Sequence, residues 1–366
     1  MKHHAVYQKF ISQDFRKFFR LKASPRSWHI PFLAGLSVGI PLMIGYYFDE
    51  VRLALTASLA GLTILYLPTQ GNIFQIMTKM FVCAFGMIVS YSFAILLSFT
   101  DWSAVLGFGI IATIFHYVSK YFNLKPPGSF FFIMIASMAL GNTHHLPNVP
   151  RSIGLFSLGA INACLLALFY SLAFLPKTTK TKIKSSFKIN PYTNFAESLI
   201  IGISMMLSVL IGRLFDLDYP YWIPISCLAI LQAVHRYHIL KRSIHRLIGT
   251  IIGLGLVWLI FTFIDNVLLL CFCIIILQII VELLITRHYA LTVIFLTPLG
   301  VLLAETGSAI TSDPNHLLQM RLIEVLIGTG LGLIGGWFLF HEKIKYLDKK
   351  YHKQSKKVIE KSFQQK

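Results

Sequence analysis

Seven cationic or histidine side chains fall within residues 235–246, between two apolar stretches of the chain. They are His235, Arg236, His238, Lys241, Arg242, His245 and Arg246. Clustered cations raise the local concentration of anions and lower the cost of bringing an anion to a low-dielectric mouth. The cluster therefore predicts the entrance of an anion path. The alternatives are a charge signal that only orients the chain in a membrane and a contact with anionic lipid headgroups.

Carboxylates within apolar stretches are the second group that could do chemistry. Glu282 and Glu324 lie deepest in such stretches, where ionisable side chains are costly and often functional. Both are candidates for proton coupling. Arg321 precedes Glu324 by one helical turn, so a structural ion pair is an equally good interpretation of Glu324.

An aromatic pair, Tyr221 and Trp222, opens the apolar stretch before the basic cluster. These rings could stack on an aromatic solute. Tyr and Trp at the end of an apolar span more often anchor it at the membrane interface, which is the alternative.

Catalytic, metal-binding and nucleic-acid functions have little support. The five cysteines all lie in apolar runs without the spacing of a metal or redox site, so we expect no metal and no cofactor. A membrane-embedded enzyme using His144, His145 or His235 would lack a suitably spaced carboxylate partner, and we predict that the protein is not an enzyme. Neither basic tail shows a nucleic-acid-binding pattern.

Composition and apolar runs predict an all-α membrane protein. The 366 residues are 55% hydrophobic and 13% charged, with a mean hydropathy of +0.68, whereas soluble chains carry about 25% charged residues. Against the length needed to cross a bilayer, the runs predict twelve transmembrane helices. They lie near 30–48, 51–68, 79–99, 102–118, 128–142, 152–175, 195–216, 219–234, 246–264, 266–285, 289–304 and 320–340.

The distribution of Lys and Arg predicts the orientation of these spans. With twelve spans both termini share a side, and that side receives 29 of the 33 basic residues. Cytoplasmic loops carry such an excess, so both termini are expected in the cytoplasm. Residues 1–29 would form an amphipathic segment on the membrane, 176–194 a basic linker and 341–366 a basic tail. We expect no cleaved signal peptide, because no apolar region precedes a small-residue cleavage site.

The two halves resemble each other at an offset of 167 residues. Residues 35–50 and 202–217 share six identical positions, and Lys79 pairs with Arg246 at the same offset. Six spans per half is an even number, so the repeats at 30–175 and 195–340 would have parallel orientation, as in some transporters.

Spans two, five, eight and eleven are short, at about 15 to 18 residues each, and Pro68, Pro224 and Pro298 interrupt or end three of them. Short or interrupted spans in corresponding places are typical of a binding site near the membrane midplane, although a short helix buried by its neighbours is an equal alternative. Four glycines would let helices pack closely. They are Gly249, Gly253, Gly328 and Gly332.

The motifs "PYWIPISCLAILQ", "RLIGTIIG", "LTPLGVLLAE" and "RLIEVLIGTGLG" resemble the fusaric acid resistance (FUSC) family of bacterial membrane proteins, related to aromatic acid exporters. The resemblance is best over 195–340. It implies an inner-membrane transporter that exports aromatic carboxylates or other small organic anions using the proton gradient. The positions it carries over are Tyr221, Trp222, Pro224, Arg246, Gly249, Thr250, Gly253, Thr297, Pro298, Arg321 and Gly328.

These observations favour a carrier whose two halves rock around an anion site, with the substrate path along the prolines, the aromatic pair and the basic cluster. An anion channel and a non-transporting membrane scaffold are the alternatives. Expected partners are membrane lipids and a small organic anion, and a homo-oligomer or an accessory efflux subunit stays open. Larger family members carry a soluble domain that the short linker here leaves no room for, so regulation and substrate also stay open.

Overall fold

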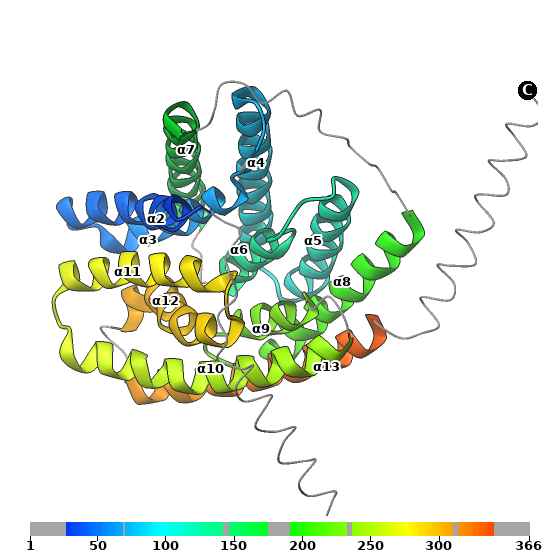
Figure 1. Ribbon diagram of the computed structural model, residues 1–366. Coiled ribbons are helices and arrows are strands. Elements are labelled where there is room, and N and C mark those ends of the chain that lie inside the picture. Colours follow the sequence, from blue (N-terminus) through cyan, green and yellow to red (C-terminus); the bar gives the residue numbers. More distant parts are fainter. Residues whose placement is uncertain are drawn as a thin grey trace, which may run out of the picture.

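A computed structural model describes residues 27–68, 70–141, 146–174, 191–232, 236–309 and 314–339. In these ranges the chain is helical and contains no strand, which confirms the predicted all-α class (Figure 1). The α-helices are α2 His29–Tyr47, α3 Val51–Gly61, α4 Ile73–Leu97, α5 Asp101–Tyr121, α6 Phe130–Gly141, α7 Val149–Phe174, α8 Pro191–Leu214, α9 Trp222–Leu231, α10 Arg236–Phe263, α11 Val267–Ile285, α12 Tyr289–Ala309 and α13 Pro314–Leu339. Two short 3₁₀ helices, η1 Leu62–Tyr66 and η2 Leu146–Asn148, continue α3 and precede α7.

Eight of these helices are long and apolar enough to cross a membrane: α2, α4, α5, α7, α8, α10, α11 and α13. The other four are shorter apolar helices, at Val51–Tyr66, Phe130–Gly141, Trp222–Leu231 and Tyr289–Ala304. Each of the twelve overlaps one predicted span, and the four short helices are the four short spans expected from the sequence. The described residues therefore form a membrane protein with eight candidate spans. Whether the short helices also cross the bilayer stays a prediction.

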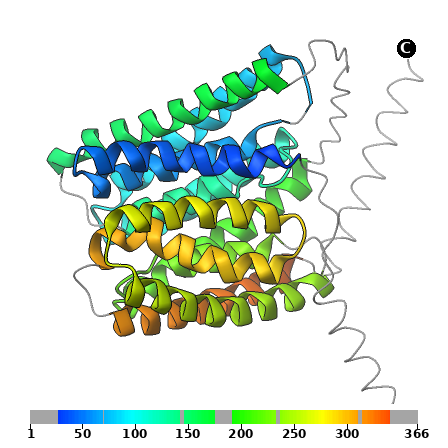
Figure 2. The same ribbon diagram turned by 60° about the vertical axis from the view of Figure 1, so that its left-hand side comes forward.

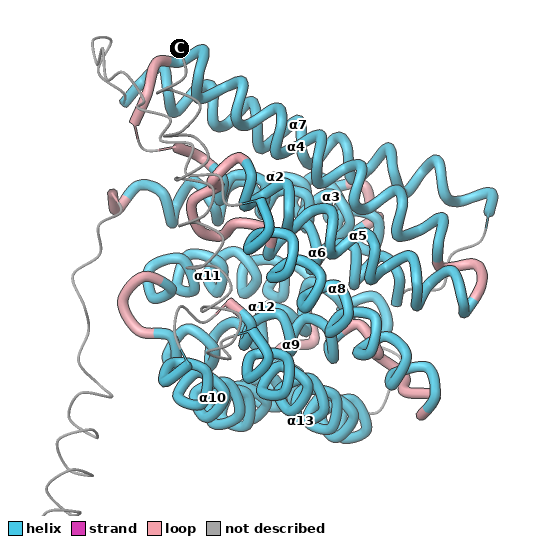
Figure 3. The backbone as a smooth tube through the Cα atoms, turned by 90° about the vertical axis from the view of Figure 1, so that its right-hand side faces the viewer, coloured by secondary structure: helices cyan, strands magenta, loops and turns pink. Residues whose placement is uncertain are grey.

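The short helices lie inside the bundle. All ten residues of α9 are buried, because α13, α8, α6 and α10 all pack against it. The short α3 packs against α2, α7 and α12 in a similar way. Long helices form the outside and expose large apolar side chains such as Phe85, Leu158 and Ile251, as lipid-facing helices do. Figure 3 shows the long pair α4 and α7 side by side on one flank.

Helices far apart in the sequence meet along two seams. In the first, α5 packs against α8. Ion pairs link the ends of this seam: Lys120 Nζ lies 2.8 Å from Glu197 Oε2, and Arg213 contacts Asp101. Between them a Cβ on Gly202 would come within 2.7 Å of a backbone oxygen of α5. The α5–α8 seam is therefore close-packed and tied at both ends.

The second seam joins α2 to α11, which lie side by side in Figure 2. Gly35 and Gly39 of α2 face isoleucines of α11, and a Cβ on Gly39 would come within 2.7 Å of Ile275. The backbones thus approach closely at the glycines. No ion pair between described residues links α2 to α11.

The helices α2 and α8 end in the same way. Asp49 and Asp216 each follow the helix with positive φ angles of 55° and 47°, a conformation that Asp tolerates better than most residues. After α2 the N–H of Glu50 donates to the carbonyl of Gly45 (2.7 Å), and after α8 the N–H of Leu217 donates to the carbonyl of Gly212 (3.0 Å). This reverse bond stabilises a helix C-terminus. The two aspartates are 167 residues apart.

Three boundaries differ from the predictions. The basic stretch expected as a loop before residue 246 is helical from Arg236 onward, because residues 236–248 contain many good helix formers and no Gly or Pro. Similarly, α4 begins at Ile73 behind a capping box formed by Asn72 and Gln75. Pro314 starts α13, at a position that suits its fixed φ angle.

Most of the expected amphipathic segment, most of the linker and the whole basic tail lie outside the described residues, as do His144, His145 and His235.

Candidate anion site

Three polar side chains form a row on one face of α10. Arg242, Arg246 and Thr250 follow each other at four-residue intervals, which places them on the same side of a helix. Arg246 and Thr250 are buried, with exposed fractions of 5% and 1%. Since α10 packs against α12, α13 and α9, the row lies within the second half of the bundle.

Arg246 bonds to the short helix α9. Its Nη2 donates a hydrogen bond of 3.1 Å to Oγ of Ser226, while its Nε is buried without a hydrogen-bond partner among the described residues. No carboxylate in the described part of the chain forms an ion pair with Arg246. A buried charge without a counter-ion is costly, so this guanidinium is suited to receive an anion.

Two more donors extend the row. The guanidinium of Arg242 lies 4.3 Å from the ring centroid of Tyr289, at the start of α12, a cation–π contact that fixes its position. Nε of Arg242 and Oγ1 of Thr250 are buried with no hydrogen-bond partner in the described ranges. From Arg242 to Thr250 the row covers about 12 Å of helix. It therefore provides donors at several depths for a small anion.

Two histidines stack beside the row. The rings of His245 on α10 and His288, between α11 and α12, lie 6.1 Å apart. Burial, and secondarily the charge of Lys241, lowers the pKa of His288 below its ordinary value. This imidazole is therefore neutral at pH 7, and the positive charge here comes from the arginines and the exposed Lys241.

Glycines let α10 and α12 approach closely next to the row. A Cβ on Gly249 would come within 2.8 Å of Val293, and one on Gly253 within 2.7 Å of a backbone oxygen of α12. Thr297 faces Gly253 and bonds the carbonyl of Val293 (2.9 Å), and Pro298 follows within the helix. The expected path residues of α12 thus lie at this helix contact.

Glycines of α13 hold α9 in the same manner. A Cβ on Gly332 would come within 2.9 Å of the Cys227 carbonyl oxygen, and one on Gly328 would collide with the carbonyl of Ile223. The backbone of α9 is therefore fixed against α13, with Pro224 in its first turn.

The aromatic pair at the start of α9 is buried. Tyr221 and Trp222 are each 5% exposed, so the interpretation as lipid-facing anchors is wrong, because neighbouring helices surround α9. The guanidinium of Arg321 lies over the Trp222 ring. Glu324 accepts a hydrogen bond of 3.0 Å from the backbone N–H of Tyr219 and so ties α13 to the entrance of α9.

Two buried arginines contact neighbouring turns of α9. Trp222, which meets Arg321, and Ser226, which meets Arg246, are four residues apart and share a helix face. The two contacts are thus separated by about 6 Å along α9. The short helix therefore brings together arginines from α10 and α13 that are distant in the sequence.

Other predicted site residues lie on other elements or at the start of α10. Glu282 is buried on α11, which packs on α12 and α2. Pro68 follows η1, and Arg236 begins α10.

Sequence reasoning missed Ser226, His288 and Tyr289. The four-residue spacing of Arg242, Arg246 and Thr250 would have indicated one helix face had the stretch been taken as helical. The contributions of α9 and α12 depend on how helices pack, which the spacing does not show.

Comparison with known proteins supports the expected resemblance. The chain is 33% identical over 145 residues to the uncharacterized membrane protein YvaC of Bacillus subtilis (strain 168), an alignment that covers 39% of this chain and 22% of the relative. The chain thus matches about a fifth of that relative's length. No solved structure matches the chain. Residues 207–335, which contain α9, the donor row and most of α13, match the family described as fusaric acid resistance protein-like, so the resemblance expected from the motifs is confirmed over this stretch.

Proposed function

We propose that this protein is a membrane transporter for small organic anions, with its anion site along Arg242, Arg246 and Thr250. The observation that carries the proposal is the guanidinium of Arg246, which is buried beside Ser226 and forms no ion pair with a described carboxylate. A structural arginine in a membrane helix is normally neutralised by a neighbour. An exchangeable anion would supply that neutralisation only while bound.

Aromatic carboxylates are the substrate class that we favour. The family description names resistance to fusaric acid, and the path includes the buried Trp222 ring one turn of α9 from Ser226. A carboxylate matches the paired donors of an arginine, while an aromatic ring could stack on Trp222. Export is the direction that the family description favours.

The transport cycle that we propose is a rocking of two six-helix repeats, within a twelve-span membrane domain, around α9 and its counterpart α3. Several observations support it. The two seams pair the first helix of each half with the fourth helix of the other half, and Asp49 and Asp216 form equivalent turns at the 167-residue offset. Parallel repeats of this kind move against each other in known transporters.

The orientation we propose places both termini in the cytoplasm of a bacterial cell, with the protein in the inner membrane. The charge distribution, with 29 of 33 basic residues on that side, supports it. Lys241 and Arg242 would then lie at the cytoplasmic mouth. Proton coupling through Glu282 or Glu324 is part of the proposal, since both are buried carboxylates in the helical bundle.

The test is flux of a panel of aromatic carboxylates in proteoliposomes, with and without a pH gradient. We expect flux in the parent protein, strong loss in Arg246→Ala, and loss of the gradient dependence in Glu282→Gln or Glu324→Gln. Arg287→Ala is the matched control, because it removes one exposed positive charge near the same end of the bundle. Equal flux in Arg246→Ala and Arg287→Ala would refute the assignment of the site. If unitary currents were recorded in a planar bilayer, the protein would be a channel instead of a carrier.

A further inference from the structure

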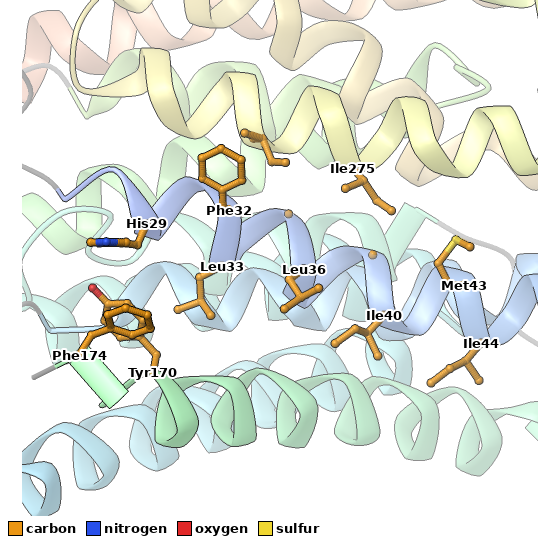
Figure 4. Close-up of a pocket in the computed structure, with 13 residues that line it drawn as sticks. His29, Phe32, Leu33, Leu36, Ile40, Met43, Ile44, Tyr170, Phe174 and Ile275 are labelled. Carbon is orange, nitrogen blue, oxygen red and sulfur yellow. The ribbon is translucent and has the colours of Figure 1, made fainter. Parts of the chain in front are cut away.

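A groove runs along the outer face of α2 at the α2–α11 seam. It has a volume of about 620 Å³ and extends from His29 to Ile44, between α7 and α11 (Figure 4). Sixteen helical residues cover about 22 Å, which exceeds the roughly 15 Å depth of one leaflet of the hydrocarbon core. The groove is thus long enough to accept an acyl chain lengthwise.

The groove is polar at one end only. Along most of its length the lining is apolar, with side chains such as Leu36, Ile40 and Met43. His29 and Tyr170 lie together at one end, with Phe174 5.1 Å from the His29 ring (Figure 4). Nδ1 of His29 is buried there without a hydrogen-bond partner among the described residues. This polarity matches a molecule with a long apolar chain and a polar head.

The sequences that connect to the helices at the polar end are rich in positive charge. Residues 16–26 join the start of α2 and carry five Lys or Arg; residues 177–188 follow the end of α7 and carry five more. Neither segment contains Asp or Glu. Two acid-free basic segments therefore connect to the described helices next to His29. Such charge attracts anionic headgroups in preference to zwitterionic ones.

The equivalent α5–α8 seam is packed differently. At the α5–α8 seam Gly202 packs directly against α5, and ion pairs hold both ends. At the α2–α11 seam the helices meet closely at Gly35 and Gly39, and the groove lies beside these glycines.

We propose that this groove binds one acyl chain of an anionic phospholipid, with the phosphate at the His29 end. The lipid would lie along the α2–α11 seam between the two halves. This site is separate from the donor row on α10, and its occupation does not depend on transport.

The test uses the full-length protein in phosphatidylcholine vesicles that contain a trace of lipid with a photoactivatable acyl chain, either phosphatidylglycerol or phosphatidylcholine. We expect phosphatidylglycerol to label peptides of α2 and of α11 near Ile275 several-fold more than phosphatidylcholine does, with competition by unlabelled phosphatidylglycerol. Leu36→Trp should abolish most of this labelling by filling the groove. Leu158→Trp, on the exposed face of α7 outside the groove, is the matched control.

Equal labelling by the two lipids would overturn the proposal, as would labelling that Leu36→Trp leaves unchanged. Cross-links between two copies of the chain at α2 would also overturn it and assign the groove to a dimer. The comparison of the two lipids on the parent protein decides the question even if the Trp variant does not fold. A failure of anion flux would leave this result unaffected.

Discussion

Replacing Arg246 by leucine should weaken anion binding while leaving the empty protein at least as stable. The guanidinium is buried and donates a hydrogen bond to Ser226. Breaking that bond costs about 1.5–3 kcal/mol. Removing an unpaired buried charge recovers a desolvation penalty of several kcal/mol. The two effects together predict an unchanged or raised melting temperature without ligand.

The expected effect on binding is much larger. An anion 4 Å from the guanidinium gains about 4 kcal/mol at an effective dielectric constant of 20. Loss of that energy raises the Kd for the anion by about three orders of magnitude, since 1.4 kcal/mol corresponds to a factor of ten. Arg246→Lys keeps the charge but lacks the planar fork, so its affinity should lie between those of the parent and the leucine variant.

The assay is thermal unfolding in detergent over a range of anion concentrations. A ligand at a hundredfold excess over Kd stabilises the folded state by about 2.7 kcal/mol, so the parent protein should shift by several degrees. Arg246→Leu should show no shift, and Arg287→Leu, which changes an exposed arginine, should behave as the parent does. A strongly destabilised Arg246→Leu that still responds to the anion would refute the reasoning, because the arginine would then be structural.

Three further changes test the packing and the charges around α9. Gly328→Ala should destabilise the fold by about 1–3 kcal/mol, because its Cβ would collide with a backbone carbonyl of α9, while Gly330→Ala, with open space at its Cβ, should be neutral or slightly stabilising in the same unfolding assay. Glu324→Ala should cost about 1–3 kcal/mol by leaving the Tyr219 N–H unsatisfied, whereas Glu324→Gln keeps an acceptor and should unfold near the parental temperature; equal loss in both would contradict this role. Burial and a neighbouring lysine charge lower the pKa of His288, so the unfolded chain binds more protons than the folded one below about pH 6.5. Stability should therefore decrease as the pH is lowered through this range, and His288→Gln should flatten that slope in pH-dependent unfolding.

The positions of the helices could be predicted from the sequence to a large extent. Lipid and protein interiors both select apolar side chains, so each apolar run became a helix that overlaps its expected place, although α4, α10 and α13 begin earlier than expected. The same ambiguity explains why the interfacial-anchor alternative was wrong. Tyr221 and Trp222 have the composition of interfacial anchors, but α9 is enclosed by other helices, and an entirely apolar helix carries no periodic signal that distinguishes lipid from protein.

The candidate site was predictable only in part. The basic cluster identifies Arg246 as a site candidate. A loop is predicted there from the sequence, because each predicted span ends where charged residues begin. Lys and Arg are good helix formers, and α10 continues through them. Ser226 and Tyr289 could not be inferred, because their contact with the row depends on the approach of α9 and α12 to α10 in three dimensions.

The seam between α2 and α11 has a consequence for synthesis of the protein. Helix α2 ends at Tyr47, and its partner α11 ends at Ile285, so the ribosome adds 238 residues between them. At 5–20 residues per second this takes about 10–50 s. During that time the glycine face of α2 at Gly35 and Gly39 has no α11 to cover it. Membrane insertion therefore has to hold α2 in place before its long-range neighbour exists, and a nascent chain stalled before α11 would expose this face to lipid or to an insertion factor.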